Sequence, residues 1–117
     1  MAEQAMQAGL IPATIAKHTV VILRKGPAFG PLEAPADKDR HNRHLAYQKS
    51  LYESGKLLIY GPVLDAPDDL RAFGVFRVES MDEARALMAA DPHVQAGYLR
   101  AEFVTWMADS AAWRERK

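Results

Sequence analysis

Strand-sized apolar runs alternate with two helix-like stretches along the chain, and this order constrains the fold more than any other feature. Residues 19–23 are rich in β-branched residues and predict a short central strand. Residues 57–64 and 70–78 predict a hairpin, in which a Gly-Pro pair marks a bulge or the end of the first strand. Residues 98–107 alternate between two faces and predict a fourth strand.

Two helices are expected between these strands. The first covers about residues 37–54, with Asp37 or Asp39 as its cap and Gly55 as its end. The second begins at a Ser-Met-Asp-Glu capping box, residues 80–83, and ends at an Asp-Pro pair. The order β-α-β-β-α-β predicts a ferredoxin-like α+β fold, in which two helices cover one face of a four-stranded antiparallel sheet.

The second face of this sheet is left uncovered by the predicted helices, with Trp106 or Phe103 among the candidates to line it. A contiguous exposed apolar face favours aggregation unless another surface covers it. A domain in a chain of 117 residues also gains stability by burying more surface against a partner. We therefore expect a homodimer formed through the open sheet face.

The length suits a single domain, which we place at residues 18–117. Residues 1–17 are expected to form an N-terminal extension with at most one helical turn. Residues 26–37 contain three prolines and two glycines and predict a long loop. Such a loop is either a binding loop or lid, or a flexible surface loop.

Composition excludes several classes of protein. Fifteen basic and fifteen acidic residues are interspersed and give a net charge of zero, which argues against a nucleic-acid binder. The absence of cysteine excludes disulfides and thiol catalysis and is typical of a cytoplasmic protein. No apolar stretch is long enough to span a membrane. Because dinucleotide and phosphate-binding motifs are also absent, we expect no cofactor.

One stripe of the first predicted helix combines apolar and polar residues: Leu45, Leu51, Tyr52, His41, His44 and Gln48. A histidine beside leucines can simply be a core residue whose ring is hydrogen-bonded. Asp65, however, follows the Gly-Pro break, which can turn its carboxylate back toward this helix. A carboxylate on one imidazole nitrogen fixes the tautomer and makes the other nitrogen more basic. We therefore expect His44 and Asp65 to form a catalytic pair, although Asp65 could also cap a turn.

Three more residues are candidates for substrate binding: Arg71, Asp91 and His93. Their alternative roles are a surface charge for Arg71 and a turn-forming side chain for Asp91. His41, His44 and His93 could together hold a metal ion, but no HExxH-type motif or fixed carboxylate completes such a site. We expect no metal.

The ordered set of these motifs resembles the YciI (YCII-related) family over about residues 19–107. The resemblance rests on Arg43-His44-Leu45, Ser54-Gly55-Lys56-Leu57-Leu58, Gly61-Pro62, Asp65, Ser80, Glu83-Ala84, Asp91-Pro92, Ala96-Gly97 and Trp106. It implies a ferredoxin-like, dimeric α/β barrel with a histidine–aspartate pair, placed on His44 and Asp65. Two positions depart from the family pattern: relatives often have arginine at the position of His41, and often a glycine where residues 69–72 read Asp-Leu-Arg-Ala.

The resemblance also implies the chemistry. Some members are similar to dehydrochlorinases of chlorinated hydroxyquinol breakdown, and the wider fold includes muconolactone isomerases and cofactor-free monooxygenases. We therefore expect a lyase or isomerase acting on a small aromatic or lactone substrate, with His44 as general acid/base. A non-catalytic ligand-binding or accessory protein and a metal-dependent enzyme are the alternatives.

Overall fold

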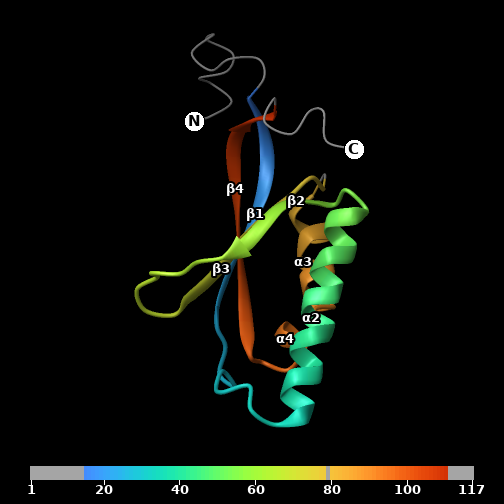
Figure 1. Ribbon diagram of the computed structural model, residues 1–117. Helices are drawn as coiled ribbons and strands as arrows, with labels where there is room; N and C mark the ends of the chain where they lie inside the picture. The colour runs from blue at the N-terminus through green and yellow to red at the C-terminus, as the bar shows by residue number, and fades with distance from the viewer. Residues whose placement is uncertain (1–14, 79, 111–117) are drawn as a thin grey trace.

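The computed structural model describes residues 15–78 and 80–110, which form four strands and three helices. In chain order they are β1 (Ile15–Lys25), α2 (Pro35–Glu53), β2 (Leu57–Pro62), β3 (Leu70–Phe76), α3 (Met81–Ala89), α4 (Pro92–Gln95) and β4 (Leu99–Asp109) (Figure 1). The order is the predicted β-α-β-β-α-β, with the short α4 added before the last strand. None of the helices in the described ranges has the length and apolar character needed to cross a membrane.

The strands form one antiparallel sheet in the order β2-β3-β1-β4. β1 lies at the centre and pairs with β4 along its whole length, from Ile15 opposite Asp109 to Lys25 opposite Leu99. All three helices lie on the same side of the sheet, and the other side is uncovered (Figure 1). The predicted ferredoxin-like α+β fold is confirmed.

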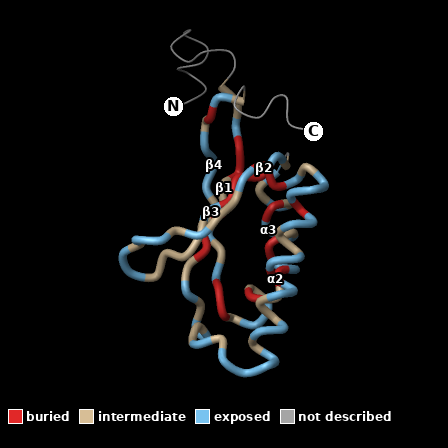
Figure 2. Tube along the Cα trace, viewed as in Figure 1, coloured by how far each residue is buried: buried red, intermediate tan, exposed pale blue. Residues whose placement is uncertain are grey.

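The hydrophobic core lies between the sheet and the helices (Figure 2). Val21 and Leu23 of β1 and Phe76 of β3 each have at most 2% of their surface exposed. Ala84 and Met88 of α3 pack against them and are equally buried. Because side chains alternate along a strand, this leaves every second residue of β1 on the uncovered face.

Two elements begin earlier than the sequence predicts. β1 starts at Ile15, so residues 15–17 belong to the sheet and not to an extension; the remaining fourteen residues, with the helical turn expected there, lie outside the described ranges. α2 starts at Pro35, because the fixed φ of proline suits the first turn of a helix. Asp37 is therefore not the cap; its carboxylate accepts a hydrogen bond from the Ala34 backbone N–H at 3.3 Å.

The buried stripe of α2 is narrower than the sequence predicts. His44 and Leu51, two turns apart, are the buried residues of this helix. Leu45 and Tyr52 are 48% and 40% exposed, although both were expected on the apolar face. Leu45 and Tyr52 each follow one of these two buried residues by one position, so they lie beside the stripe of α2 that faces the sheet.

The uncovered sheet face carries Trp106, as expected, with 49% of its surface exposed. Phe103 was also a candidate for this face, but it packs against the core, and the Arg85 guanidinium of α3 lies 5.6 Å from its ring. The difference follows from the alternation of β4, since positions 103 and 106 differ by an odd number of residues.

The loop after β1 is held against the beginning of β4. The Gly26 N–H donates to the Tyr98 carbonyl at 2.9 Å, and the Ala28 N–H donates to the Gly97 carbonyl at 2.8 Å. A Cβ atom at Gly26 would lie 2.1 Å from the Gly97 oxygen, so this approach requires glycine. These contacts hold the loop in place and argue against a flexible surface loop.

Leu57 and Leu64 allow a matched test of the core. Leu57 has 2% of its surface exposed and lies in the core, whereas Leu64 in the hairpin loop is 88% exposed. We expect Leu57→Ala to lower the free energy of unfolding by about 2–5 kcal/mol, because it removes buried surface and leaves a cavity. Leu64→Ala should change it by less than about 0.5 kcal/mol. Urea unfolding followed by circular dichroism measures both, and equal losses would contradict this core.

Candidate active site

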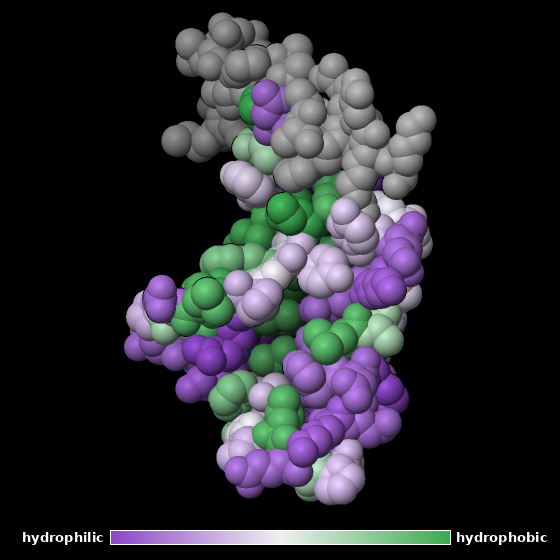
Figure 3. Space-filling view, in the orientation of Figure 1, coloured by the Kyte–Doolittle hydropathy of each residue, from purple (hydrophilic) through white to green (hydrophobic). Residues whose placement is uncertain are grey.

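A cavity of about 250 Å³ lies between α2, the β2–β3 hairpin and α4. In Figure 3 a shaded hollow is visible between the hairpin and α2. The polar side chains that line the cavity are His41, His44, Arg71 and His93. Apolar and aromatic residues form the rest of its wall: Phe29, Pro62, Val63, Ala72, Tyr98 and Leu99.

The centre of this site is a hydrogen bond between His44 of α2 and Asp91, which precedes α4. His44 Nδ1 lies 2.7 Å from Asp91 Oδ2 and 2.9 Å from Oδ1. Asp91 is completely buried, and its Oδ1 also accepts from the His93 backbone N–H at 2.8 Å, which caps α4. Since a carboxylate only accepts, His44 Nδ1 carries the hydrogen. The lone pair of a neutral His44 therefore resides on Nε2.

Asp91 takes the place that the sequence analysis gave to Asp65. β2 ends at Pro62, and the chain then enters the hairpin loop, which projects away from α2 (Figure 1). Asp65 lies in that loop and is exposed to solvent. The expected His44–Asp65 pair is therefore corrected to a His44–Asp91 pair, because the Gly-Pro break sends the chain outward and not back toward the helix.

A second hydrogen-bonded chain runs beside this pair. Arg40 Nε donates to His93 Nδ1 at 3.1 Å, and His93 Nε2 lies 3.0 Å from His41 Nδ1. The ring of His93 also lies against the rings of His44 and Tyr98, with centroid distances of 4.5 Å and 4.3 Å. The site thus gathers three histidines from α2 and α4 around one buried carboxylate.

The environment keeps two of these histidines neutral. His93 is 1% exposed, and its burial, together with the nearby His44 and Arg40, lowers its pKa to about 4. Burial also lowers the pKa of His41, and His44 and Arg40 act in the same direction. At neutral pH both rings can therefore donate one hydrogen bond and accept one.

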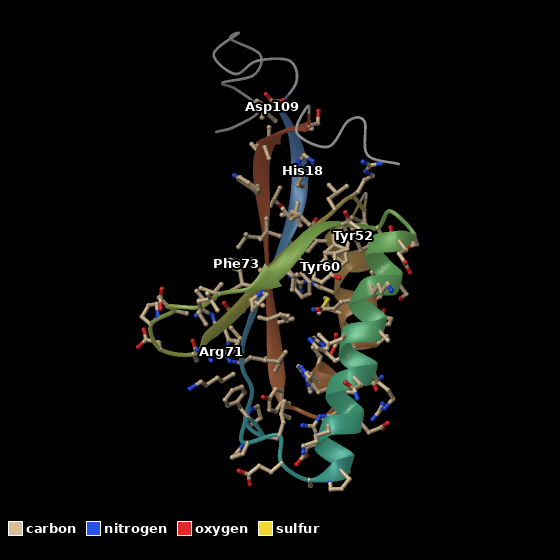
Figure 4. All side chains as sticks on the ribbon, in the orientation of Figure 1. His18, Tyr52, Tyr60, Arg71, Phe73 and Asp109 are labelled. Atoms are coloured by element: carbon tan, nitrogen blue, oxygen red, sulfur yellow. The ribbon has the colours of Figure 1, made fainter. Side chains whose placement is uncertain are left out.

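Arg71, the third residue expected to bind substrate, lines the same cavity from β3 and is labelled in Figure 4. Its Nε donates to the Leu70 carbonyl at 2.8 Å, and its guanidinium lies 5.8 Å from the ring of Phe29. Phe29 in turn stacks on Tyr98, with 4.6 Å between ring centroids. The structure thus brings Arg71 and His93 to one cavity, and substrate binding by them stays a prediction. Asp91 is completely buried behind His44 and does not line the cavity, so the expected contact of its side chain with substrate is replaced by the hydrogen bond to His44.

The sequence analysis did not predict the contacts that His44, His93 and Arg71 make with one another's neighbours in the cavity. It placed His41 and His44 on one helical face, and this spacing is the signal that could have indicated a joint role for them. Phe29 and Tyr98 left no such signal, because they meet only through the docking of the loop after β1. In the described part of the chain, no three His, Cys, Asp or Glu side chains form a metal-binding group.

The buried His93 predicts a dependence of stability on pH. The unfolded chain takes up a proton near pH 6.5, whereas folded His93 resists protonation until about pH 4. The free energy of unfolding should therefore fall as the pH falls from about 6.5 to about 4, by up to about 3 kcal/mol. Urea unfolding over this range measures the slope. His93→Gln should flatten it, and an unchanged slope in that variant would assign the effect to other groups.

The comparisons with known proteins agree with this architecture. The YCII-related domain matches residues 19–107, and a comparison with curated proteins gives no match. Among solved structures, the chain is similar to 5-chloro-2-hydroxyhydroquinone dehydrochlorinase from Burkholderia phenoliruptrix in complex with 2,5-dihydroxybenzoquinone. The two share 27% identity with a TM-score of 0.57, over 80% of this chain and 97% of the other. The chain belongs to the YCII-related family.

Proposed function

We propose that this protein is a small cofactor-free lyase or isomerase in which His44 is the general acid/base and Asp91 orients it. The observation that carries the proposal is the 2.7 Å hydrogen bond between His44 Nδ1 and the buried Asp91 carboxylate. This bond holds the imidazole in one tautomer and stabilises the imidazolium after proton uptake. His44 lines the cavity, so Nε2 is the nitrogen available to a substrate proton.

The proposed substrate is a single oxygenated ring, such as a chlorinated hydroxyquinol or a related lactone. A volume of about 250 Å³ suits one ring with small substituents. The stacked Phe29 and Tyr98 offer an aromatic wall, and the Arg71 guanidinium can meet a phenolate oxygen. The similar dehydrochlorinase structure holds a dihydroxybenzoquinone, a ligand of this size and chemistry.

Loss of hydrogen chloride from such a substrate needs a group that both takes and gives a proton. Two hydroxyl protons leave, the chlorinated carbon gains one proton, and chloride departs from that carbon; the sum is loss of HCl. His44 Nε2 can take a hydroxyl proton and, as the imidazolium, return it to the ring carbon. An isomerase reaction uses the same two transfers without a leaving group.

The alternative is a non-catalytic ligand-binding or accessory protein. A cavity filled by tyrosine or phenylalanine side chains would favour that role. Tyr52 and Tyr60 instead contact each other, with ring centroids 5.8 Å apart and an edge-on geometry (Figure 4), and neither lines the cavity. An open cavity serves an enzyme and a ligand-binding protein alike, so it is the His44–Asp91 hydrogen bond that favours the enzyme hypothesis.

The first test measures chloride release and quinone absorbance with 5-chloro-2-hydroxyhydroquinone as the probe. His44→Asn keeps a donor for Asp91 but removes the titrating nitrogen, so we expect kcat to fall by about 10²–10⁴-fold. Asp91→Asn would place an amide N–H₂ against His44 Nδ1 and favour the wrong tautomer, and a loss of at least about 10²-fold is expected.

Asp65→Asn is the matched control, since it makes the same chemical change in the hairpin loop, and its kcat should stay within about twofold of the unaltered protein. Turnover that survives in His44→Asn would contradict the proposed general acid/base. No turnover in the unaltered protein, combined with tight binding of 2,5-dihydroxybenzoquinone, would favour the ligand-binding alternative.

We also propose that two copies of the chain pair through the uncovered sheet face. Large apolar side chains gather on this face: Ile59 is 55% exposed, Phe73 44%, Val104 46% and Trp106 49%. Ile59 and Phe73 also border a hollow of about 320 Å³ on the sheet. A second copy of the same face would cover this surface, because a two-fold interface joins identical patches.

Val104 and Leu45 provide a matched pair for this proposal, because their exposed fractions are 46% and 48% but Leu45 lies on α2. We expect Val104→Glu to give a monomer, since two carboxylates would face each other or be buried at the interface. Leu45→Glu should remain dimeric. Sedimentation equilibrium measures the masses, and an unaltered protein that stays monomeric at about 50 μM would contradict the dimer.

A further inference from the structure

We propose that His41 is a second functional residue of the cavity, a neutral imidazole that donates a hydrogen bond from Nε2 to a substrate oxygen, and that Arg40 fixes this role through His93. The inference rests on the proposed function, since it assigns the donor that works with the base His44. It concerns a histidine that lies one turn before His44 on α2 and lines the same cavity.

The direction of the hydrogen bonds carries the assignment. Arg40 Nε can only donate, so His93 Nδ1, 3.1 Å away, must accept. A neutral His93 then carries its hydrogen on Nε2 and donates it to His41 Nδ1 at 3.0 Å. His41 Nδ1 is thereby an acceptor, and the one hydrogen of a neutral His41 ring resides on Nε2.

The opposite direction is unfavourable at the Arg40 end of the chain. If His41 carried a hydrogen on Nδ1, His93 Nε2 would have to accept it and the hydrogen of His93 would move to Nδ1. There it would point at the N–H of Arg40 Nε, so two donors would oppose each other at 3.1 Å. Because arginine keeps its charge at any physiological pH, the chain has one favourable direction. An imidazolium at His41 is disfavoured for the same reason.

The Nε2 atom of His41, which carries this hydrogen, is accessible from the cavity. Within the described residues, no buried side-chain nitrogen or oxygen lacks a hydrogen-bond partner. The Nε2 atoms of His41 and His44 make no hydrogen bond to described residues, so both are reached by solvent, and both rings line the cavity. A ligand in the cavity therefore meets two imidazole nitrogens of opposite character.

These two nitrogens complement each other chemically. His44 Nε2 carries the lone pair and accepts a proton, whereas His41 Nε2 carries a hydrogen and donates. The rings are 5.9 Å apart, centroid to centroid, and inclined by 28°, so one small ligand in the cavity can meet both. As His44 removes a hydroxyl proton, negative charge develops on a ring oxygen, and a fixed neutral donor stabilises it without itself losing the proton.

The first experiment determines the tautomers of the imidazole rings by two-bond ¹H–¹⁵N correlation in the full chain at pH 7. We expect hydrogen on Nε2 of His41 and His93 and on Nδ1 of His44. Arg40→Gln should raise the pKa of His41 and mix its tautomers, because the fixed donor and its charge are lost. Arg43→Gln, which removes an arginine on the same helix that pairs with Asp39 at 3.0 Å, should change neither. A hydrogen on His41 Nδ1, an imidazolium at His41, or equal spectra for the two variants would overturn the proposal.

The second experiment titrates 2,5-dihydroxybenzoquinone against two variants. His41→Phe keeps a ring but has no donor, and we expect binding to weaken by about tenfold or more. His41→Gln offers an amide N–H and should stay within about threefold of the unaltered protein. Equal binding by all three proteins would overturn the donor role. Failure of the unaltered protein to bind the quinone, with the tautomers as described, would count against the proposed substrate class and not against the hydrogen-bond chain.

Discussion

The buried carboxylate of Asp91 is the group on which the site depends. A completely buried charge is stable only if hydrogen bonds replace its hydration, and Asp91 obtains them from the His44 ring and the His93 backbone N–H. One side chain therefore joins α2 to the beginning of α4. Because α4 is only four residues long, this contact also determines where the His93 ring lies. The same interaction joins the two helices and holds the His44 ring in one tautomer, as the proposed acid/base role requires.

The helices and the hairpin contribute different kinds of residue to the cavity. The helices provide its imidazole side chains, His44 and His41 on α2 and His93 on α4, which are the groups of the proposed proton transfer. The hairpin provides part of the apolar wall, and its base is tied down by Asp69, which pairs with Arg24 at 2.9 Å and Arg100 at 2.6 Å. These ion pairs lie on the sheet, away from the helices.

The sequence predicted the fold well because alternation and β-branched runs report directly on which face of a strand is buried. It predicted the site less well, and Asp91 shows why. An aspartate before a proline is a local signal for a helix cap, and Asp91 is indeed such a cap. Its second contact, to His44 forty-seven positions earlier in the chain, comes from the packing of α4 against α2 and leaves no local pattern. Asp65 was preferred because Gly-Pro predicts a change of direction without saying which way the chain turns.

The ion pairs of Asp69 hold the base of the hairpin, and this bears on how proteins of this fold acquire new substrates. The segment between β2 and β3, residues 63–69, sits outside the sheet pairing and can change in length or composition while Asp69 keeps its two arginine partners. Of these seven residues only Val63 lines the cavity, so such changes would alter the surface beside it and leave the buried carboxylate and its histidines where they are. The loop and the buried His44–Asp91 pair are thus encoded in separate stretches of the chain, so that the loop can drift over evolutionary time, or be redesigned, without rebuilding the pair.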